Sequence, residues 1–261
     1  MSSDWSSDVC SSDLVNRLHR LLLASFGASA PARDGLLLSD PPAAFLGDRG
    51  TGVHMSESEA IYLIDGSSYI HRAYHAIRNL ANSSGVPTNA VYGFVRMLLK
   101  LVKDRNPRYL AVVFDPRGKT FRHDIYEDYK ANRPPAPEDL VAQIPYIKRI
   151  VRGLNVRMLE MEGYEADDLI GTLARRAEEQ GRRVVVVTGD KDFRQIVSPR
   201  VSLWDSMRDK TTDYETFKEA YEGLEPPQIV ELMGLAGDSS DNIPGVPGKR
   251  KKTALNLIRD H

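Results

Sequence analysis

The sequence has almost no cysteine, no long hydrophobic run and almost no net charge. Its single cysteine, Cys10, can form no disulfide within the chain, which fits a reducing compartment, and we expect a cytoplasmic protein. A transmembrane helix needs about 18 or more apolar residues in a row, and no stretch reaches that length, so no membrane partner is expected. The net charge of −1, from 35 basic and 36 acidic residues, neither indicates nor excludes nucleic acid, so the distribution of the charges has to decide.

The first 54 residues differ in character from the rest of the chain. Ser-Ser-Asp recurs at Ser2, Ser6 and Ser11, and later glycine, alanine and proline interrupt any periodicity. An export signal is an alternative, because basic residues precede an apolar stretch, but that stretch is short and broken and acidic residues come before it. We therefore interpret residues 1–54 as a disordered or artefactual leader.

Three short apolar runs indicate buried strands, and each is followed by an aspartate. The runs cover residues 61–64, 110–114 and 184–187, and the aspartates are Asp65, Asp115 and Asp190. Amphipathic helices are predicted over residues 87–106, 140–151 and 166–177, a further strand over 201–204 and a helix over 214–221. This alternation predicts an α/β fold with a mostly parallel central sheet flanked by helices. The three aspartates would then gather at the carboxyl edge of the sheet, where ligands bind in such folds.

Residues 163–170 add a second group of acids, Glu165, Asp167 and Asp168, at the start of a predicted helix. The ordinary interpretation is a helix N-terminus whose macrodipole favours negative charge. However, Asp190 and Asp192 would emerge at the same edge of the sheet. Carboxylates that share one rim repel one another at neutral pH unless a cation lies between them.

The acids form one candidate metal site. No histidine or cysteine has ligand spacing, and an all-oxygen site suits Mg²⁺ or Mn²⁺. Two such ions, about 3.5 to 4 Å apart, can activate a water and stabilise the leaving oxygen of a phosphodiester. We therefore predict two ions per site and a phosphate-containing substrate. The candidate ligands are Asp65, Asp115, Glu165, Asp167, Asp168, Asp190, Asp192, Asp238 and Asp241.

Between residues 117 and 133, basic and aromatic side chains alternate. The cations are Arg117, Lys119, Arg122, Lys130 and Arg133, interleaved with Phe121, Tyr126 and Tyr129. One interpretation is a solvated helix face with ion pairs four residues apart. The other is a nucleic-acid contact, in which cations meet phosphates and rings stack on unpaired bases.

The end of the chain reads as a separate small unit. A helix is predicted from Pro226 through Met233, a loop over residues 237–242, and a last helix over 253–258 after the glycine-rich stretch 245–248. A helix, a glycine-rich hairpin and a second helix can lay backbone amides along a phosphate strand.

Six short strings carry a family resemblance: LIDGSS, VFD, YKANRPP, GYEADDLIGTLA, TGDKDF and GDSSDNIPGVPG. From about Ile61 to Ile258 the chain resembles the 5′-nuclease domain of bacterial DNA polymerase I, a member of the flap endonuclease family. The resemblance implies a PIN-like 5′-nuclease catalytic domain over residues 55–225, with a helical arch around residues 117–135 that encloses a 5′ single strand. It also implies a helix-hairpin-helix DNA-binding region over residues 226–261.

The resemblance assigns roles to particular residues. The nine acids would bind the metal ions, with Asp65, Asp115 and Asp190 central to catalysis, and Lys130 and Arg133 would hold the scissile phosphate. Tyr129 would stack on a base near the cut. The DNA contacts implied are Arg122, Tyr129, Lys130, Arg133, Gly245, Gly248, Lys252 and Thr253.

The implied activity is metal-dependent 5′-3′ exonuclease and structure-specific flap endonuclease hydrolysis of DNA by a two-metal-ion mechanism, in replication and repair, for primer removal and nick processing. The implied partner is DNA with a 5′ flap, a nick or a duplex end, bound by a monomer. Two departures from the family pattern stand out: Arg250 occupies a position where glycine is expected, and the chain stops at His261, so that the DNA-binding region reads as truncated and the family's polymerase domain is absent.

Two other functions are open. A nucleic-acid-binding module of the same fold that has lost catalysis should show gaps in the set of acids, and none is visible. An aspartate-based phosphatase normally carries a second acid two residues after the first strand-end aspartate, and Ser67 stands there instead. The nuclease is therefore the favoured interpretation.

Overall fold

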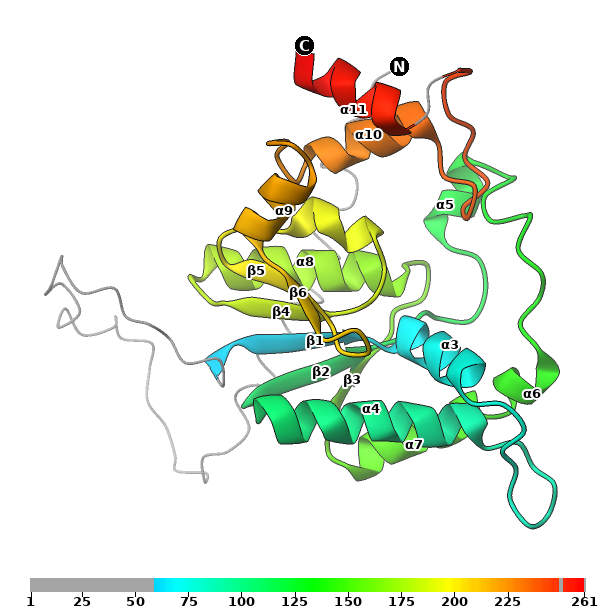
Figure 1. Ribbon diagram of the computed structural model, residues 1–261. Coiled ribbons are helices and arrows are strands. Elements are labelled where there is room, and N and C mark those ends of the chain that lie inside the picture. The colour runs from blue at the N-terminus through cyan, green and yellow to red at the C-terminus, as the bar shows by residue number, and fades with distance from the viewer. Residues whose placement is uncertain (1–58, 249–250, 261) are drawn as a thin grey trace, which may run out of the picture.

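The computed structural model describes residues 59–248 and 251–260 (Figure 1). The predictions that concern the leader, residues 1–54, and Arg250 lie outside these residues. Among the helices of the two described ranges, none combines the length and the apolar character that crossing a membrane requires.

The centre of the fold is a mostly parallel sheet, as the sequence predicted, and it has six strands. Its strands are β1 (Ile61–Asp65), β2 (Tyr109–Val113), β3 (Arg157–Leu159), β4 (Val184–Val187), β5 (Val201–Asp205) and β6 (Lys210–Thr212). They lie in the order β3-β2-β1-β4-β5-β6, and only β6 pairs antiparallel. The order reverses between β1 and β4, because the chain builds outward from β1 first on one side and then on the other. Such a reversal is where open parallel sheets bind ligands.

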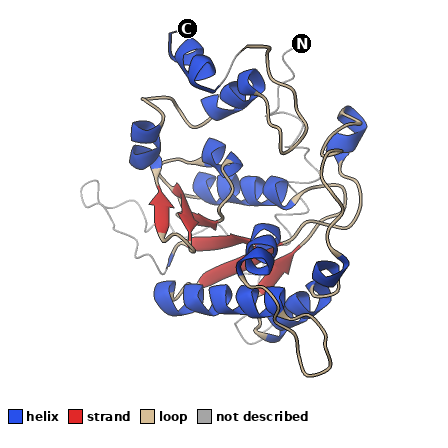
Figure 2. Cartoon of the chain, turned by 45° about the vertical axis from the view of Figure 1, so that its right-hand side comes forward, coloured by secondary structure: helices blue, strands red, loops and turns tan. Residues whose placement is uncertain are grey.

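Helices cover both faces of the sheet (Figures 1 and 2). One face carries α3 (Gly66–Ala76), α4 (Asn89–Arg105), α6 (Glu138–Val141) and α7 (Ile144–Gly153). The other carries α8 (Ala166–Glu179), the 3₁₀ helix η2 (Asp192–Ile196), α9 (Tyr214–Ala220), α10 (Gln228–Ala236) and α11 (Lys251–Asp260). Alternate residues of β1 supply the two cores: Leu63 packs with the α8 side, and Ile64 packs with the α4 side. The β-branched and aliphatic strands are apolar throughout because both faces are buried.

The segment predicted as a helical arch leaves the sheet after β2 and returns at α6. It contains one short helix, α5 (Phe121–Ile125), and otherwise consists of turns, so it is less helical than expected. In Figure 1 it is the green chain on the right, and it lies beside the loop between α10 and α11.

Some details of the sequence prediction were wrong. The helix predicted over residues 140–151 is two helices, α6 and α7, because Pro145 lacks the N–H that would bond the carbonyl four residues earlier. The apolar pattern of residues 87–106 predicts Leu99 and Val102 on the buried face of α4, but these side chains are 51% and 40% exposed. Strands β3 and β6 and helix α3 were not predicted, because β3 and β6 have only three residues each and α3 follows β1 without a break.

The C-terminal unit shows the predicted order of helix, loop and helix, and α10 packs directly against α11. Helix α10 ends at Gly237, whose φ of 76° favours glycine. A side chain at Gly245 would place its Cβ only 2.4 Å from the backbone of Ala236, so the loop folds back closely onto the end of α10. Asp238 and Ile243 close the loop with paired backbone hydrogen bonds.

Candidate active site

Asp65, at the end of β1, is held by hydrogen bonds from helix α3 and from the segment that follows β4. Asp65 caps helix α3 by accepting a 2.9 Å hydrogen bond from the backbone N–H of Ser68. Its other oxygen accepts a 2.9 Å hydrogen bond from the hydroxyl of Thr188, just after β4. The Thr188 hydroxyl in turn accepts from the backbone N–H of Asp190, so one threonine joins the first and third strand-end acids.

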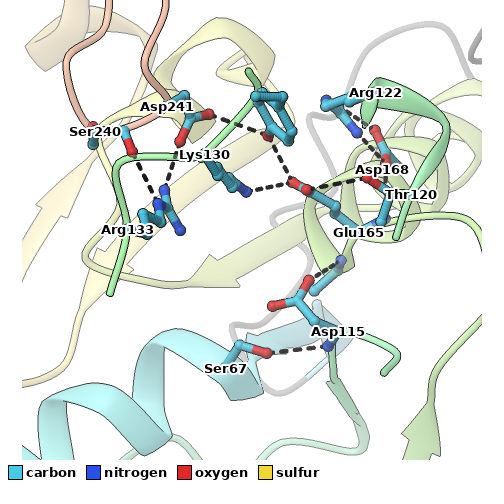
Figure 3. A network of polar contacts seen from close by, with 12 residues as sticks. Ser67, Asp115, Thr120, Arg122, Lys130, Arg133, Glu165, Asp168, Ser240 and Asp241 are labelled. Carbon is cyan, nitrogen blue, oxygen red and sulfur yellow. Dashed lines mark hydrogen bonds and ion pairs between the residues drawn. The ribbon is translucent and has the colours of Figure 1, made fainter. Parts of the chain in front are cut away.

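Asp115 connects the β2 end to helix α8. Its Oδ1 accepts a 2.7 Å hydrogen bond from the backbone N–H of Ala166, the first residue of α8, and its own N–H donates to the hydroxyl of Ser67 (Figure 3). A carboxylate at a helix N-terminus satisfies a free backbone donor and meets the positive end of the macrodipole. The acids of the 163–170 stretch are thereby held next to the strand-end acids, as the sequence predicted.

The pKa values show that these acids are crowded. Burial, together with the nearby charges of Asp115 and Asp190, raises the pKa of Asp65 to about 7. Burial and repulsion by Asp65 and Asp190 hold the pKa of Asp167 well above its usual value. Burial and the charge of Asp190 raise the pKa of Asp192 to about 6. Burial and mutual repulsion both disfavour the ionised forms of these carboxyl groups.

Asp192 also carries a buried oxygen without a partner. Its Oδ1 accepts no hydrogen bond within the described chain. A buried acceptor left unpaired is costly, and in native proteins it often marks the position of an ion or a water. This carboxyl group belongs to the acid cluster, because the charges of Asp190, Asp238 and Asp241 all act on it.

Glu165 accepts hydrogen bonds from three side chains of the segment 117–133. It is buried, at 8% exposure, and its Oε2 accepts from Lys130 Nζ at 2.8 Å and from the Tyr129 hydroxyl at 3.1 Å. Its Oε1 accepts a longer hydrogen bond from Thr120 (Figure 3). The backbone N–H of Glu165 donates to Asp168, which completes a reciprocal capping box at the start of α8.

Asp168 forms an ion pair with Arg122. Both guanidinium Nη atoms lie 2.7 Å from its two oxygens, and the two side chains are only 14% and 4% exposed. The nearby acids hold the pKa of Arg122 above its usual value. A bidentate ion pair of this kind holds α5 against the start of helix α8.

The segment 126–133 is fastened to the loop 238–242 by contacts from both sides. Arg133 pairs with Asp241 at 2.5 Å and donates from Nε to the carbonyl of Ser240. Three further contacts join the same two stretches: Tyr126 to the carbonyl of Asn242, Asn132 to that of Ser239, and Asn242 to that of Asp128. Basic and acidic residues that are far apart in the sequence therefore meet here.

Tyr129 lies inside this contact rather than on the surface. It is 6% exposed, and its hydroxyl is 3.1 Å from Glu165 and 3.2 Å from Asp241. The neighbouring acids and burial hold its pKa above the usual value. The stacking role implied by the family resemblance would require the ring to leave this position.

Asp238 is also paired with a cation, Lys191. Asp238 is 4% exposed, pairs with Lys191 at 2.9 Å and accepts from the N–H and hydroxyl of Ser240. These contacts hold its pKa below the usual value despite burial. Lys191 was not among the predicted site residues, although the sequence places it between Asp190 and Asp192.

Comparison with known proteins decides the family. The model of the 5′-3′ exonuclease N-terminal resolvase-like domain matches residues 60–222. The chain belongs to this family. It is 43% identical over 203 residues to a 5′-3′ exonuclease of Aquifex aeolicus, covering 78% of this chain and 70% of that protein. It is 46% identical over 204 residues to DNA polymerase I of Bacillus caldotenax, covering 76% of this chain and 23% of that protein.

Solved structures of low sequence identity share the fold. The T5 D15 protein co-crystallized with metal ions superposes with a TM-score of 0.64 at 24% identity, covering 77% of this chain and 74% of that one. The catalytic core of Rad2 in complex with a DNA substrate gives 0.53 at 18% identity, covering 78% and 61%. The chain spans about a quarter of the length of the DNA polymerase I relatives it matches.

Within this family member, the structure brings the predicted acids and the basic pair Lys130 and Arg133 into one region. Gly245, Gly248, Lys252 and Thr253 belong to the C-terminal unit, whose loop also carries Asp238 and Asp241. Within the described residues, no three acidic, histidine or cysteine side chains already surround a single point as a finished metal site. The protein cations Lys130, Arg133 and Lys191 occupy several of the carboxylates instead.

Sequence reasoning also missed a half-buried cation, Arg72 on α3. It pairs with Asp205 at 2.9 Å, its Nη1 is buried without a hydrogen-bond partner, and its guanidinium packs over Gly189, where an added Cβ would lie 2.3 Å from Nη1. The signal was present, because residue 72 is two helical turns after Asp65 and therefore on the same face of α3.

Proposed function

We propose that the chain is a metal-dependent 5′-3′ exonuclease and flap endonuclease that hydrolyses DNA phosphodiesters. The observation that carries the proposal is the acid cluster itself. Asp65, Asp167 and Asp192 all have raised pKa values, and the buried Oδ1 of Asp192 has no partner. A cluster that is electrostatically unsatisfied on its own is suited to a bound cation.

The donors fit Mg²⁺ or Mn²⁺. They are carboxylate oxygens, which hard divalent ions prefer, and they come from strand ends and a helix N-terminus that the backbone holds in place. Asp65, Asp115, Asp167, Asp190 and Asp192 would hold the ions, and Glu165, Asp238 and Asp241 would do so once their protein cations withdraw. Two bound ions would supply an activated water and stabilise the leaving oxygen. Solved neighbours of the same fold contain divalent metal ions.

The chain's own residues handle the phosphate. Lys130 and Arg133 lie on the segment that faces the acids, and in the structure they neutralise Glu165 and Asp241. When a scissile phosphate enters, these two cations would transfer to its oxygens and stabilise the charge that develops there. Arg122, held by Asp168, orients the segment, and Arg72 offers an unpaired N–H beside the strand-end acids.

The C-terminal unit is proposed to grip duplex DNA. Helix α11 begins with Lys251 and Lys252, and Gly248, with a φ of 76°, lies just before it with open space around its Cα. Backbone amides and lysines in this arrangement bind phosphates without reading sequence. We propose that residues 226–261 act as a helix-hairpin-helix and that the 5′ single strand of a flap or nick passes beneath the segment 117–135. The monomeric protein would act in primer removal and nick processing, in replication and repair.

The test is cleavage of a 5′-labelled flap duplex by the purified chain with Mg²⁺, with Ca²⁺ and with EDTA. We expect 5′ products with Mg²⁺ only. The Asp190→Asn variant should lose turnover, yet it should bind DNA in Ca²⁺ as well as or better than the parent, because fewer negative charges face the phosphates. Asp104→Asn, at an exposed position in the last turn of α4 and at the opposite edge of the sheet, is the matched control. Undiminished cleavage by Asp190→Asn would remove this acid from the site.

A further inference from the structure

Arginines line the edge of the sheet opposite the acids. This edge is formed by the amino ends of the parallel strands, at the left in Figure 1. The residues are Arg108 before β2, Arg157 at the start of β3, Arg182 and Arg183 before β4, and Arg200 before β5. We call these five residues the arginine edge. Since neighbouring strands lie about 4.8 Å apart, the row from β3 to β5 is roughly 20 Å long.

The sheet itself keeps these arginines in line. Ile61 of β1 pairs with Tyr109 of β2 and with Val184 of β4, and Val184 pairs with Val201. The carbonyl of Arg183 accepts from the N–H of Ile61 at 2.9 Å, and that of Arg200 accepts from Val184 at 2.8 Å. The spacing of the row is therefore a property of the rigid core.

The side-chain contacts of three of these arginines involve uncharged groups. The guanidinium groups of Arg108 and Arg182 lie 5.4 and 4.7 Å from the centre of the Tyr109 ring. Arg182 donates to the carbonyl of Glu59, and its buried Nε has no hydrogen-bond partner. Arg200 is exposed and donates to the carbonyl of Gly181. A ring and two carbonyls orient these cations without cancelling their charge.

A purely structural role accounts for only part of the row. Cations stabilise helix C-termini, and α4 ends at this edge with Arg105. However, Arg108, Arg182 and Arg200 lie in the connections that enter strands, beyond the last turn of any helix. The last turn of helix α8 carries both Arg176 and Glu179, so its dipole already has a cation within the helix and does not explain why the connections are basic.

We propose that the arginine edge binds the phosphate backbone of nucleic acid at a surface separate from the active site. A guanidinium group matches phosphate oxygens at two points, and several arginines along one sheet edge suit a linear polyanion that carries a charge about every 3.4 Å along each strand. The Tyr109 ring already contacts two guanidinium groups, so we expect the contact with nucleic acid to be to the backbone and independent of sequence. An acidic protein is less well matched, because protein interfaces have an apolar centre, whereas the connections 106–108, 180–183 and 198–200 expose no large apolar side chain and Leu154, before β3, lies at one end of the row.

The proposal goes beyond cleavage of the flap, because the arginine edge and the acids lie at opposite edges of the sheet. A short substrate that fills the active site cannot also lie along the arginine edge. The edge therefore holds a distant part of a long DNA or a second molecule, and it contributes to the affinity for long nucleic acid only.

The test compares two double variants that each remove two exposed charges. Arg108→Gln with Arg200→Gln alters the arginine edge, and Arg96→Gln with Arg149→Gln alters exposed positions on α4 and α7. Binding of a duplex of about 60 base pairs is measured in EDTA over a range of salt. The slope of log K against log salt should fall by about 2 in the edge variant, from about 0.9 per lost phosphate contact, and should stay at the parent value in the control.

Further measurements separate the possible outcomes. Single-turnover cleavage of a short flap with Mg²⁺ should be equal in the parent and the edge variant. If the parent does not cleave the flap, the proposed nuclease function fails. The difference in salt slope would still support the arginine edge in that case. Arg108→Gln alone, which removes only the ring contact, tests the edge if the double variant unfolds, and its slope should fall by about 1. Equal slopes in all proteins overturn the proposal. Loss of poly-L-glutamate binding in the edge variant with an unchanged DNA slope also overturns it, and assigns the edge to an acidic protein.

Discussion

Lys130 donates a hydrogen bond from Nζ to Oε2 of Glu165 over 2.8 Å, so a cation proposed to hold the phosphate is engaged by an acid proposed to face the metal ions. The pair is shielded, with side-chain exposures of 23% and 10%. Arg133 and Asp241 repeat the arrangement at 2.5 Å. In the absence of DNA, the two cations stand in for the charge that divalent ions would supply. We therefore expect metal binding and release of the segment 126–133 to be linked, and such coupling is reciprocal.

The first prediction follows from this exchange of partners. Adding Ca²⁺ without DNA should loosen the segment 126–133, because an ion at Glu165 or Asp241 competes with Lys130 and Arg133. The backbone N–H of Lys130, bonded to the carbonyl of Asp241 at 3.1 Å, should then exchange with solvent faster. Hydrogen exchange read by mass spectrometry checks this, with K⁺ at equal ionic strength as the control. Slower exchange with Ca²⁺ would contradict the linkage.

The second prediction separates chemistry from affinity. Lys130→Ala should lower single-turnover cleavage about 100-fold or more, because one well-placed donor to developing charge contributes about 3 to 4 kcal/mol. The dissociation constant for DNA in Ca²⁺ should change less than about tenfold, since one phosphate contact among many is lost. Lys119→Ala, at an exposed position of the same segment, is the matched control. Equal losses in rate and affinity would make Lys130 a simple binding residue.

The sequence predicted the central fold well because its signals are local. Buried strands β1, β2 and β4 are short apolar runs, and α8 has an unbroken apolar face that ends at Gly181. Strand β6 could not be predicted, because KTT is polar and exposed, and only its pairing with β5 makes it a strand. The break between α6 and α7 lies at Pro145 and at the buried Gln143, whose side chain caps the start of α4 from 53 residues away.

The sequence predicted which residues belong to the candidate site, but not which of them pair with each other. The strand-end position of Asp65 and Asp115 follows from topology, so their grouping could be foreseen. That Lys130 neutralises Glu165, and that Tyr129 is buried between two acids, depends on how a long segment folds back onto the sheet. No local pattern encodes that return path.

The third prediction concerns the pair of Arg122 and Asp168. Arg122→Met should destabilise the fold by about 3 kcal/mol, because it leaves the carboxylate of Asp168, 4% exposed, without its two-point partner. Arg175→Met, which removes an exposed helix pair with Glu179, should cost about 0.5 kcal/mol or less. Urea unfolding measures both. Similar small losses would mean that solvent or a rearranged segment compensates Asp168.

The last prediction is that Asp65 destabilises the metal-free fold at neutral pH. Its pKa is raised from 3.8 to about 7. A folded-state pKa above the unfolded value means that the stabilising contribution is complete below pH 3.8 and is lost as the pH rises through about 7. Asp65→Asn cannot ionise, keeps the shape, and can still accept the N–H of Ser68. In EDTA at pH 8 this variant should therefore be more stable than the parent, by up to about 4 kcal/mol for a shift of about three units.

The pH dependence of this difference is the decisive measurement. At pH 5 the Asp65 carboxyl of the folded parent is already protonated, so the advantage of Asp65→Asn should shrink to about 1 to 2 kcal/mol, the residual cost between pH 3.8 and 5. Asp213→Asn is the matched control: Asp213 caps α9 by accepting from Thr216, its pKa is lowered, and its effect should be the same at pH 5 and pH 8. Millimolar Mg²⁺ should stabilise the parent more than Asp65→Asn, because the ion neutralises the acid cluster only where the charge is present. An Asp65→Asn protein that is less stable than the parent in EDTA at pH 8 would show that the acids are already balanced by the protein's own cations.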